Sequence, residues 1–189
     1  GDGAGGEAED PLAAMSWLPR WRAEETPARA DAESETAGTV AILAADADSP
    51  LTQALAAACP GAAIRPGSAT TEPADTVYLL APSGPVSYRD IDIAAPGAAT
   101  ADLLRVLRPL REGGARITVV TGNAWALGAE EHVDPVAAGL SGLARGAARE
   151  ANGLMAVIDI DPRDNPQTNA ALIAAEPPQR EGETIMLRR

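Results

Sequence analysis

Residues 116–161 constrain the fold more than any other stretch, because they hold a strand, a helix and a second strand in succession. The first strand is predicted at 117–121, where every residue is β-branched (ITVVT), as is common in a buried parallel strand. Asp134 and Pro135 predict the helix start, since the carboxylate can cap the first turn and proline lacks an N–H that would stay unpaired there. With a second strand at 154–160, a right-handed βαβ unit is expected.

The helix after Asp134 is expected to end at Glu150 and to pack on the sheet through one apolar stripe. The residues of this stripe recur at helical spacing and are Val136, Leu140, Leu143 and Ala147. Glycines at 139, 142 and 146 lie within the same helix. Small residues at these positions predict a close approach by the sheet or by a partner helix.

The remaining apolar runs predict further strands and helices. Strands are expected at 39–45, 62–65, 76–81 and 183–187, and helices at 49–60, 100–111 and 169–175. The Ser49 hydroxyl is expected to cap the first of these helices, and Gly113-Gly114 to end the second. The second helix is expected to bury one stripe, formed by Leu103, Val106, Leu107 and Leu110. Residues 82–100 are expected to form a long connection. The chain has no phenylalanine, so its core must be built from small aliphatic side chains between layers. The order predicts an α/β fold, a truncated Rossmann-like, doubly wound and mostly parallel sheet with helices on both faces.

The chain is expected to divide into a linker and docking segment, residues 1–37, and one domain. Residues 1–37 begin with a glycine-rich acidic stretch and end in an alanine- and glutamate-rich one, which predicts a linker. Within them, Trp17 and Trp21 could each bury on the order of 150–250 Å². This segment is therefore expected to dock on a neighbouring surface, or else to pack as a loop on its own sheet. Residues 38–189 are expected to form the Rossmann-like domain.

Short motifs follow one another in a fixed order between the predicted strand at 117–121 and the one at 154–160. They are Thr121-x-x-Ala124, Asp134-Pro135, Gly142-Leu143-x-Arg145, Glu150 and Val157-Ile158-Asp159. This order resembles the structural subdomain of ketoreductases in modular type I polyketide synthases. The sequence departs from that pattern at two points. The family usually has Thr-Arg-Gly-Ala, where Gly122 and Asn123 form the middle pair here, and it usually has tryptophan before Gly-Leu, where Ser141 stands here.

The resemblance implies a ketoreductase of two Rossmann-like halves, of which the second binds NADPH and reduces a β-keto group on an intermediate tethered to a carrier protein. The present chain resembles the first half, a degenerate copy that lost its cofactor site and buttresses the second. The resemblance therefore implies no cofactor, metal or catalytic residue in this chain. The residues expected to dock or pack are Trp17, Trp21, Gly142, Leu143 and Arg145.

The same resemblance implies a setting. The chain is expected to be one region of a larger megasynthase of the acyltransferase and ketoreductase type, working in the biosynthesis of polyketides such as antibiotics. Its expected partners are the catalytic ketoreductase half and the neighbouring dehydratase, enoylreductase or methyltransferase and acyl carrier protein domains.

The turn after the first strand bears directly on nucleotide binding. A pyrophosphate site there needs glycines and free N–H groups at the helix start. Residues 44–50 read AADADSP, with no glycine, with carboxylates at Asp46 and Asp48, and with Pro50 lacking an N–H. Each carboxylate about 4 Å from a phosphate would cost up to roughly 4 kcal/mol at an effective dielectric near 20. This turn is therefore predicted not to hold a dinucleotide.

The catalytic groups of a reductase are also missing. Ketoreductases of the short-chain dehydrogenase type use a tyrosine and a lysine four residues apart, and this chain has no lysine. Tyr78 is expected in the core, and Tyr88 in surface packing of the long connection. His132 is the single histidine, so it offers neither a metal site nor a catalytic triad, and it is expected in a solvated loop.

Three other residues are candidates for a functional site. Asp159 and Asp161 end a predicted strand at the edge where α/β sheets bind ligands, so they could serve an acid or metal role or cap a turn. Ser141 lies in a sequence that superficially resembles a nucleophile elbow, but it is expected in mid-helix, whereas such an elbow lies at a strand-to-helix turn.

Charge and cysteine content exclude several classes of function. The net charge of −12 and the scattered arginines argue against nucleic-acid binding. No apolar run approaches the roughly 20 residues that span a bilayer. The single cysteine, Cys59, can form no internal disulfide and is expected to be a small buried residue, which favours a cytoplasmic chain.

Two hypotheses from different classes remain, with a variant of the first. The first is a non-catalytic scaffold that packs on the catalytic ketoreductase half. The second is a free-standing α/β enzyme or small-ligand-binding domain that uses Asp159, Asp161 and the connection at 82–100. As a variant of the first, the chain could serve a module whose ketoreductase is inactive.

Overall fold

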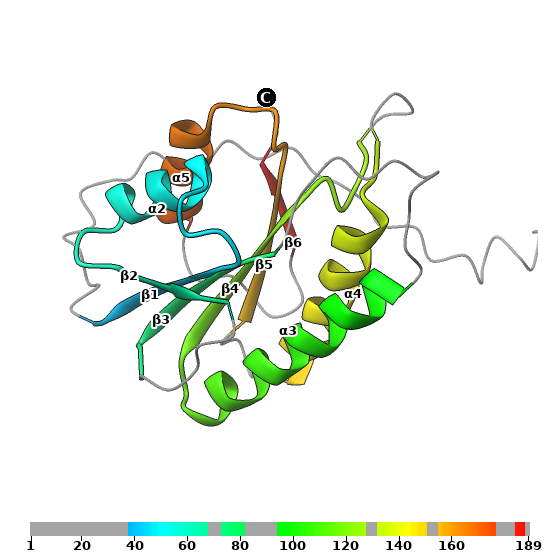
Figure 1. The fold of residues 1–189 in the computed structure, drawn as a ribbon, viewed down its shortest axis with the longest axis horizontal. Helices are drawn as coiled ribbons and strands as arrows, with labels where there is room; N and C mark the ends of the chain where they lie inside the picture. The colour runs from blue at the N-terminus through cyan, green and yellow to red at the C-terminus, as the bar shows by residue number, and fades with distance from the viewer. Residues whose placement is uncertain are drawn as a thin grey trace, which may run out of the picture.

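The computed structural model describes residues 38–67, 73–81, 94–127, 132–150, 155–176 and 184–187 (Figure 1). The strands are β1 (Val40–Ala44), β2 (Ala63–Pro66), β3 (Thr76–Leu80), β4 (Arg116–Gly122), β5 (Met155–Ile160) and β6 (Thr184–Leu187). The helices are α2 (Pro50–Ala58), α3 (Ala94–Glu112), α4 (Pro135–Glu150) and α5 (Pro166–Ala175). The predicted linker and docking segment at 1–37, with Trp17 and Trp21, and Tyr88 in the long connection lie outside the described residues.

The six strands form one sheet in the order β2-β1-β3-β4-β5-β6, and every neighbouring pair is parallel. The order reverses between β1 and β3, which is the switch point of a doubly wound sheet. Strands and helices follow one another along the chain as the sequence predicts. The α/β, Rossmann-like fold class is therefore confirmed.

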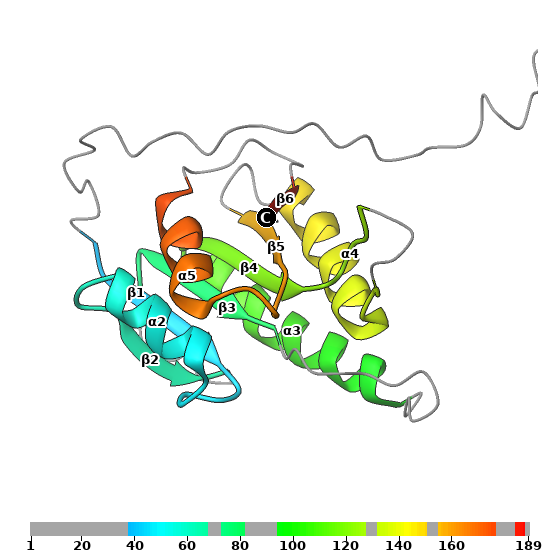
Figure 2. The same ribbon diagram turned by 90° about the horizontal axis from the view of Figure 1, so that it is seen from above.

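Helices cover both faces of the sheet. Helices α2 and α5 lie on one face, and α3 and α4 lie on the other (Figure 2). Alternate strand residues serve the two layers: Ile42 and Ile158 face α2 and α5, whereas Leu43 and Val157 face α3 and α4. Two apolar layers around a fully parallel sheet explain why the central strands read as continuous apolar runs.

Two helices begin earlier than their apolar periodicity predicts. Helix α3 begins at Ala94, so residues 94–100 are helical and do not belong to the predicted connection. Helix α5 begins at Pro166, because the Asn165 side chain accepts hydrogen bonds from the amides of Gln167 and Thr168 and caps it there. In both cases the first turn contains proline or small residues that carry no apolar stripe.

The buried face of α4 is rotated from the predicted one. Its fully buried positions are Ala137, Leu140, Ser141, Ala144 and Ala148. Val136, Leu143 and Ala147, which belong to the predicted stripe, are only partly buried at its margin. Alanines allow the helix backbone to approach the sheet, so of the predicted stripe only Leu140 belongs to the buried face.

The glycines of α4 lie on the exposed face of the helix and not on the face that packs on the sheet. Gly142 is exposed, and a Cβ added at Gly139, Gly142 or Gly146 would meet no atom within 4 Å. The predicted approach of the sheet to these glycines is wrong.

None of the helices in the described ranges is long and apolar enough to cross a membrane.

The predicted apolar stripe of α3 is confirmed, and the helix ends as its glycines suggest. Leu103, Val106, Leu107 and Leu110 are all buried. At the end of α3, Gly114 adopts a left-handed φ of 74°, and the Ala115 amide donates to the Leu110 carbonyl across 3.2 Å. This six-residue loop back to the last turn is a Schellman motif, which satisfies a carbonyl that the helix end would leave unpaired.

Truncation of a core leucine should separate the layer contact from helix propensity. Leu55 of α2 is fully buried, whereas Leu104 of α3 is 48% exposed, and both lie in mid-helix. We expect Leu55→Ala to lower the free energy of unfolding by about 2–5 kcal/mol in urea titrations, because it leaves a cavity. Leu104→Ala should stay within about 0.5 kcal/mol of the parent. Equal losses for the two variants would contradict the two-layer core.

A reciprocal clamp joins the amino ends of β1 and β3. The Thr39 amide and hydroxyl donate to Asp75 Oδ2 across 2.7 and 2.9 Å, and the Asp75 amide donates to the Thr39 carbonyl across 2.9 Å. A Cβ at Gly38 would lie 2.7 Å from the Asp75 Cβ, so only glycine fits this approach. The bonds from the Thr39 amide and then its hydroxyl hold the pKa of Asp75 below its ordinary value of 3.8.

The clamp should give unfolding a defined pH dependence. Because the folded-state pKa of Asp75 is lowered, its contribution to stability is present above the ordinary value and is lost as pH falls through the folded pKa. We expect Asp75→Asn to be less stable than the parent at pH 7, with the difference shrinking below about pH 4. Urea titrations between pH 7 and pH 3 measure this. Thr39→Val removes only the hydroxyl and should show a smaller change of the same sign. A difference between Asp75→Asn and the parent that stays constant down to pH 3 would refute the assignment.

Candidate functional site at the carboxyl edge of the sheet

The carboxyl ends of parallel strands form the edge at which doubly wound sheets bind ligands. Three turns at this edge are described: the β1–α2 turn, the β4–α4 connection without residues 128–131, and the β5–α5 turn. The first lies at the switch point, where a dinucleotide would be expected. Asp159 of β5 contacts the second, and Asp161 lies in the third.

The β1–α2 turn is closed by its own side chains. Asp46 Oδ1 accepts from the Asp48 amide across 3.0 Å, and Ser49 Oγ accepts from the Thr52 amide across 3.2 Å. The Thr52 hydroxyl donates to the Asp46 carbonyl across 2.9 Å, and the Gln53 side-chain amide donates to the Ala47 carbonyl across 2.7 Å. Ser49 is thus the predicted N-cap of α2, with Pro50 in its first turn.

These contacts determine what the turn offers to a ligand. The amides of residues 48 and 52 point at the chain's own oxygens, and Pro50 supplies none. Both carboxylates of the turn are exposed, so an approaching phosphate would meet negative charge. An anion gains little here, because a helix start binds phosphate through amides that no side chain has capped.

The β4–α4 connection is built around Asp159, which lies in β5 and is fully buried. The parallel register pairs Thr121 of β4 with Asp159, so the two side chains point to the same face of the sheet, the one that α4 covers. The Thr121 hydroxyl and the Ala124 amide donate to Asp159 Oδ1 across 2.7 and 2.9 Å. The Trp125 amide donates to Oδ2 across 3.3 Å.

Asn123 turns the chain at the end of β4. Its φ of 55° is left-handed, a conformation that asparagine tolerates better than most residues. Its amide donates to the Ile160 carbonyl across 3.0 Å, and its carbonyl accepts from the Asp134 amide across 2.8 Å. Asp134 in turn accepts from the amides of Val136 and Ala137, as the predicted cap of α4.

Trp125 joins this connection to α4. Its indole N–H donates to Ser141 Oγ across 3.0 Å, and the Arg145 guanidinium lies 5.2 Å from the centre of its ring. Ser141 and Arg145 are one turn apart and so share a face of the helix. The predicted docking residue Arg145 therefore packs on the chain's own indole, and the buried Ser141 is a hydrogen-bond acceptor in mid-helix.

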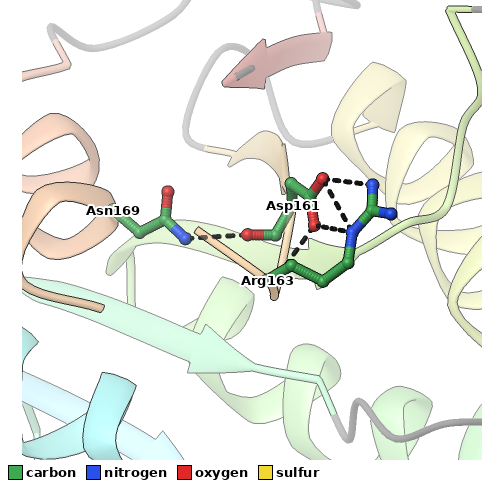
Figure 3. Close-up of polar contacts among 3 residues, drawn as sticks. All are labelled: Asp161, Arg163 and Asn169. Carbon is green, nitrogen blue, oxygen red and sulfur yellow. Dashed lines mark hydrogen bonds and ion pairs between the residues drawn. The ribbon is translucent and has the colours of Figure 1, made fainter. Parts of the chain in front are cut away.

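The β5–α5 turn is organised around Asp161 (Figure 3). Its Oδ1 accepts from the Arg163 amide and Nε across 2.9 and 3.0 Å, and its Oδ2 accepts from Arg163 Nη2 across 2.6 Å. The Asn169 side-chain amide donates to the Asp161 carbonyl across 3.0 Å. The carboxylate thus holds a turn and an arginine together, and Asn169 ties the turn to α5.

The other residues that the sequence singled out, Tyr78, Cys59 and His132, make none of the contacts described at this edge. Tyr78 packs beside the α2 and α5 layer, where Cys59 also lies partly buried. His132 is exposed. Within the described ranges, no cluster of three or more histidine, cysteine, aspartate or glutamate side chains is placed to hold a metal ion.

The sequence reasoning missed Trp125 and the role of Thr121. A tryptophan just after a strand, sixteen residues before a serine in the next helix, carries no local pattern that marks a contact. The motif Thr121-x-x-Ala124 did point to the right segment. Its meaning is visible only in the register with β5, since both residues donate to Asp159.

One known protein family matches most of the chain. The family model described as the Rossmann fold domain of polyketide synthase extender module SpnB matches residues 20–188. The chain belongs to this family. The match confirms the resemblance to a domain of a modular polyketide synthase and the Rossmann-like fold. No curated protein matches the chain.

A double-mutant cycle can measure how much the Trp125–Ser141 hydrogen bond stabilises this Rossmann fold domain. Ser141→Ala should lower the free energy of unfolding by about 1 kcal/mol, because it leaves the indole N–H without its acceptor. In a Trp125→Phe background, the same substitution should cost clearly less, since no N–H remains to be satisfied. Urea unfolding of the four proteins measures the coupling. Additive effects of the two substitutions would show that the hydrogen bond does not contribute.

Proposed function

We propose that this Rossmann fold domain is the non-catalytic structural subdomain of a polyketide synthase ketoreductase. In this role it packs against the half that binds NADPH and reduces the β-keto intermediate, within a cytoplasmic megasynthase. Its work is mechanical: it presents a stable sheet and two helical layers to the catalytic half and to the neighbouring domains. The family supplies the polyketide synthase setting.

One observation carries the proposal. At the switch point of the sheet, the β1–α2 turn uses its amides on Asp46 and Ser49 and exposes two carboxylates. Dinucleotide binding at this place relies on amides and on glycines that let the backbone approach the pyrophosphate. A turn closed in this way leaves the shape of a coenzyme fold without its binding chemistry. The lack of any lysine in the sequence also removes the tyrosine and lysine pair of a reductase.

The alternative of a free-standing enzyme or ligand-binding domain has less support. It would rely on Asp159 and Asp161, but Asp159 is fully buried beneath the β4–α4 connection. Asp161 is engaged by Arg163 on both carboxylate oxygens. Each carboxylate already stabilises a turn, so neither is presented to a substrate. A scaffold for an inactive ketoreductase would use the same contacts as a scaffold for an active one.

Two measurements test the proposal together. Isothermal titration calorimetry of the full chain with NADPH should show no saturable binding. An intact two-half ketoreductase serves as the positive control. Mixing the chain with a separately produced catalytic half should then give a complex on size-exclusion chromatography and raise the melting temperature of that half, because a partner that binds only the folded state stabilises it.

The control for the mixing experiment is an unrelated Rossmann-fold domain of similar size, which should leave the melting temperature unchanged. Saturable NADPH binding by this chain alone would overturn the non-catalytic role. Failure to form a complex with its own catalytic half would overturn the buttressing role.

A further inference from the structure

Asp159 is an unusual residue for its position. It lies within β5, between apolar neighbours, and none of its surface is exposed. Aspartate is rarely fully buried, and removing its charge from water is costly unless donors replace the lost hydration. The strand itself does not need a carboxylate here, because its ladder is formed by the backbone. The donors around the side chain indicate what it does instead.

Two of the three donors come from the segment that directly follows β4. Thr121 belongs to β4 and is placed by the strand register. The amides of Ala124 and Trp125 belong to the connection, and they reach Asp159 only because Asn123 has turned the chain in a left-handed conformation. A residue in that conformation is retained when surrounding contacts over-determine it. The carboxylate provides such contacts.

We propose that Asp159 is a latch that holds residues 123–125 at the carboxyl ends of β4 and β5 and thereby sets the position of Trp125. The chain of contacts runs from Asp159 to the Trp125 amide, and from the Trp125 indole to Ser141 and Arg145 of α4. A side chain of one strand thus fixes how a connection meets a helix. This role concerns contacts within the chain. It therefore does not depend on whether the domain packs against a catalytic ketoreductase half.

Amide hydrogen exchange of the full chain by NMR tests the latch. Asp159→Asn keeps the size of the side chain but replaces one acceptor oxygen with a donor that would face other donors. The amides of Ala124 and Trp125 should exchange at least about tenfold faster, because their shared acceptor loses its charge and one of its two oxygens. The amide of Leu43 in β1 serves as the reference for global opening and should change much less.

Fluorescence gives a second readout. In a Trp17→Phe, Trp21→Phe background, Trp125 is the single indole of the chain. Asp159→Asn should shift its emission to the red and increase its quenching by acrylamide. The matched control is Asp161→Asn, two residues along, which removes a carboxylate that serves Arg163. This control should leave both the Trp125 emission and the exchange of Ala124 unchanged.

Thr121→Val keeps the proposal testable where Asp159→Asn does not fold. It removes one donor and keeps the shape of the side chain, so a smaller rise in exchange is expected at the same two amides. A rise confined to Ala124 and Trp125 in either variant supports the latch. Unchanged exchange, or a rise that is equal in Leu43, would overturn it.

Discussion

The buried carboxylate of Asp159 is the constraint on which the carboxyl end of the central strands depends. Out of water, a carboxylate needs donors in the right places, and here β4 and the residues that follow it supply them. One comes from Thr121 through the strand register, and two come from amides that follow the left-handed Asn123. The hydrogen bonds to Asp159 therefore offset both the cost of burying its charge and the cost of turning the chain at Asn123. The same contacts join β4, β5 and residues 123–125.

The same region shows what surrounds one position at which the sequence departs from the motif. The resemblance places a tryptophan directly before Gly142, where this chain has Ser141. Here an indole reaches that place from Trp125, and its N–H donates to the Ser141 hydroxyl. The Arg145 guanidinium carbon lies 5.2 Å from the centre of that ring, within the range of a cation–π contact. The position that departs from the motif thus contacts an aromatic ring of the adjacent connection.

The sequence was sufficient for the fold because periodicity and capping are local. The strand at 117–121, the caps Ser49 and Asp134, and the α3 stripe all follow from neighbours a few residues apart. The helix starts at Ala94 and Pro166 were missed because their first turns carry no apolar pattern. The rotation of α4 was missed because its alanines contact the sheet more closely than its larger residues do. The Asp159 and Trp125 contacts depend on register and on one left-handed residue, which a linear pattern does not encode.

The three described turns at the carboxyl edge share one chemical arrangement. Backbone amides at the ends of parallel strands, the groups that bind phosphate in related folds, point here at Asp46, Asp159 and Asp161. An acceptor that belongs to the chain is present at a high effective concentration and does not dissociate from it, so a free anion must displace it in order to bind. At the three described turns, the chain's own carboxylates therefore occupy amides that an anion would otherwise use. The contacts that hold these turns in place and the contacts that compete with a free phosphate are the same ones.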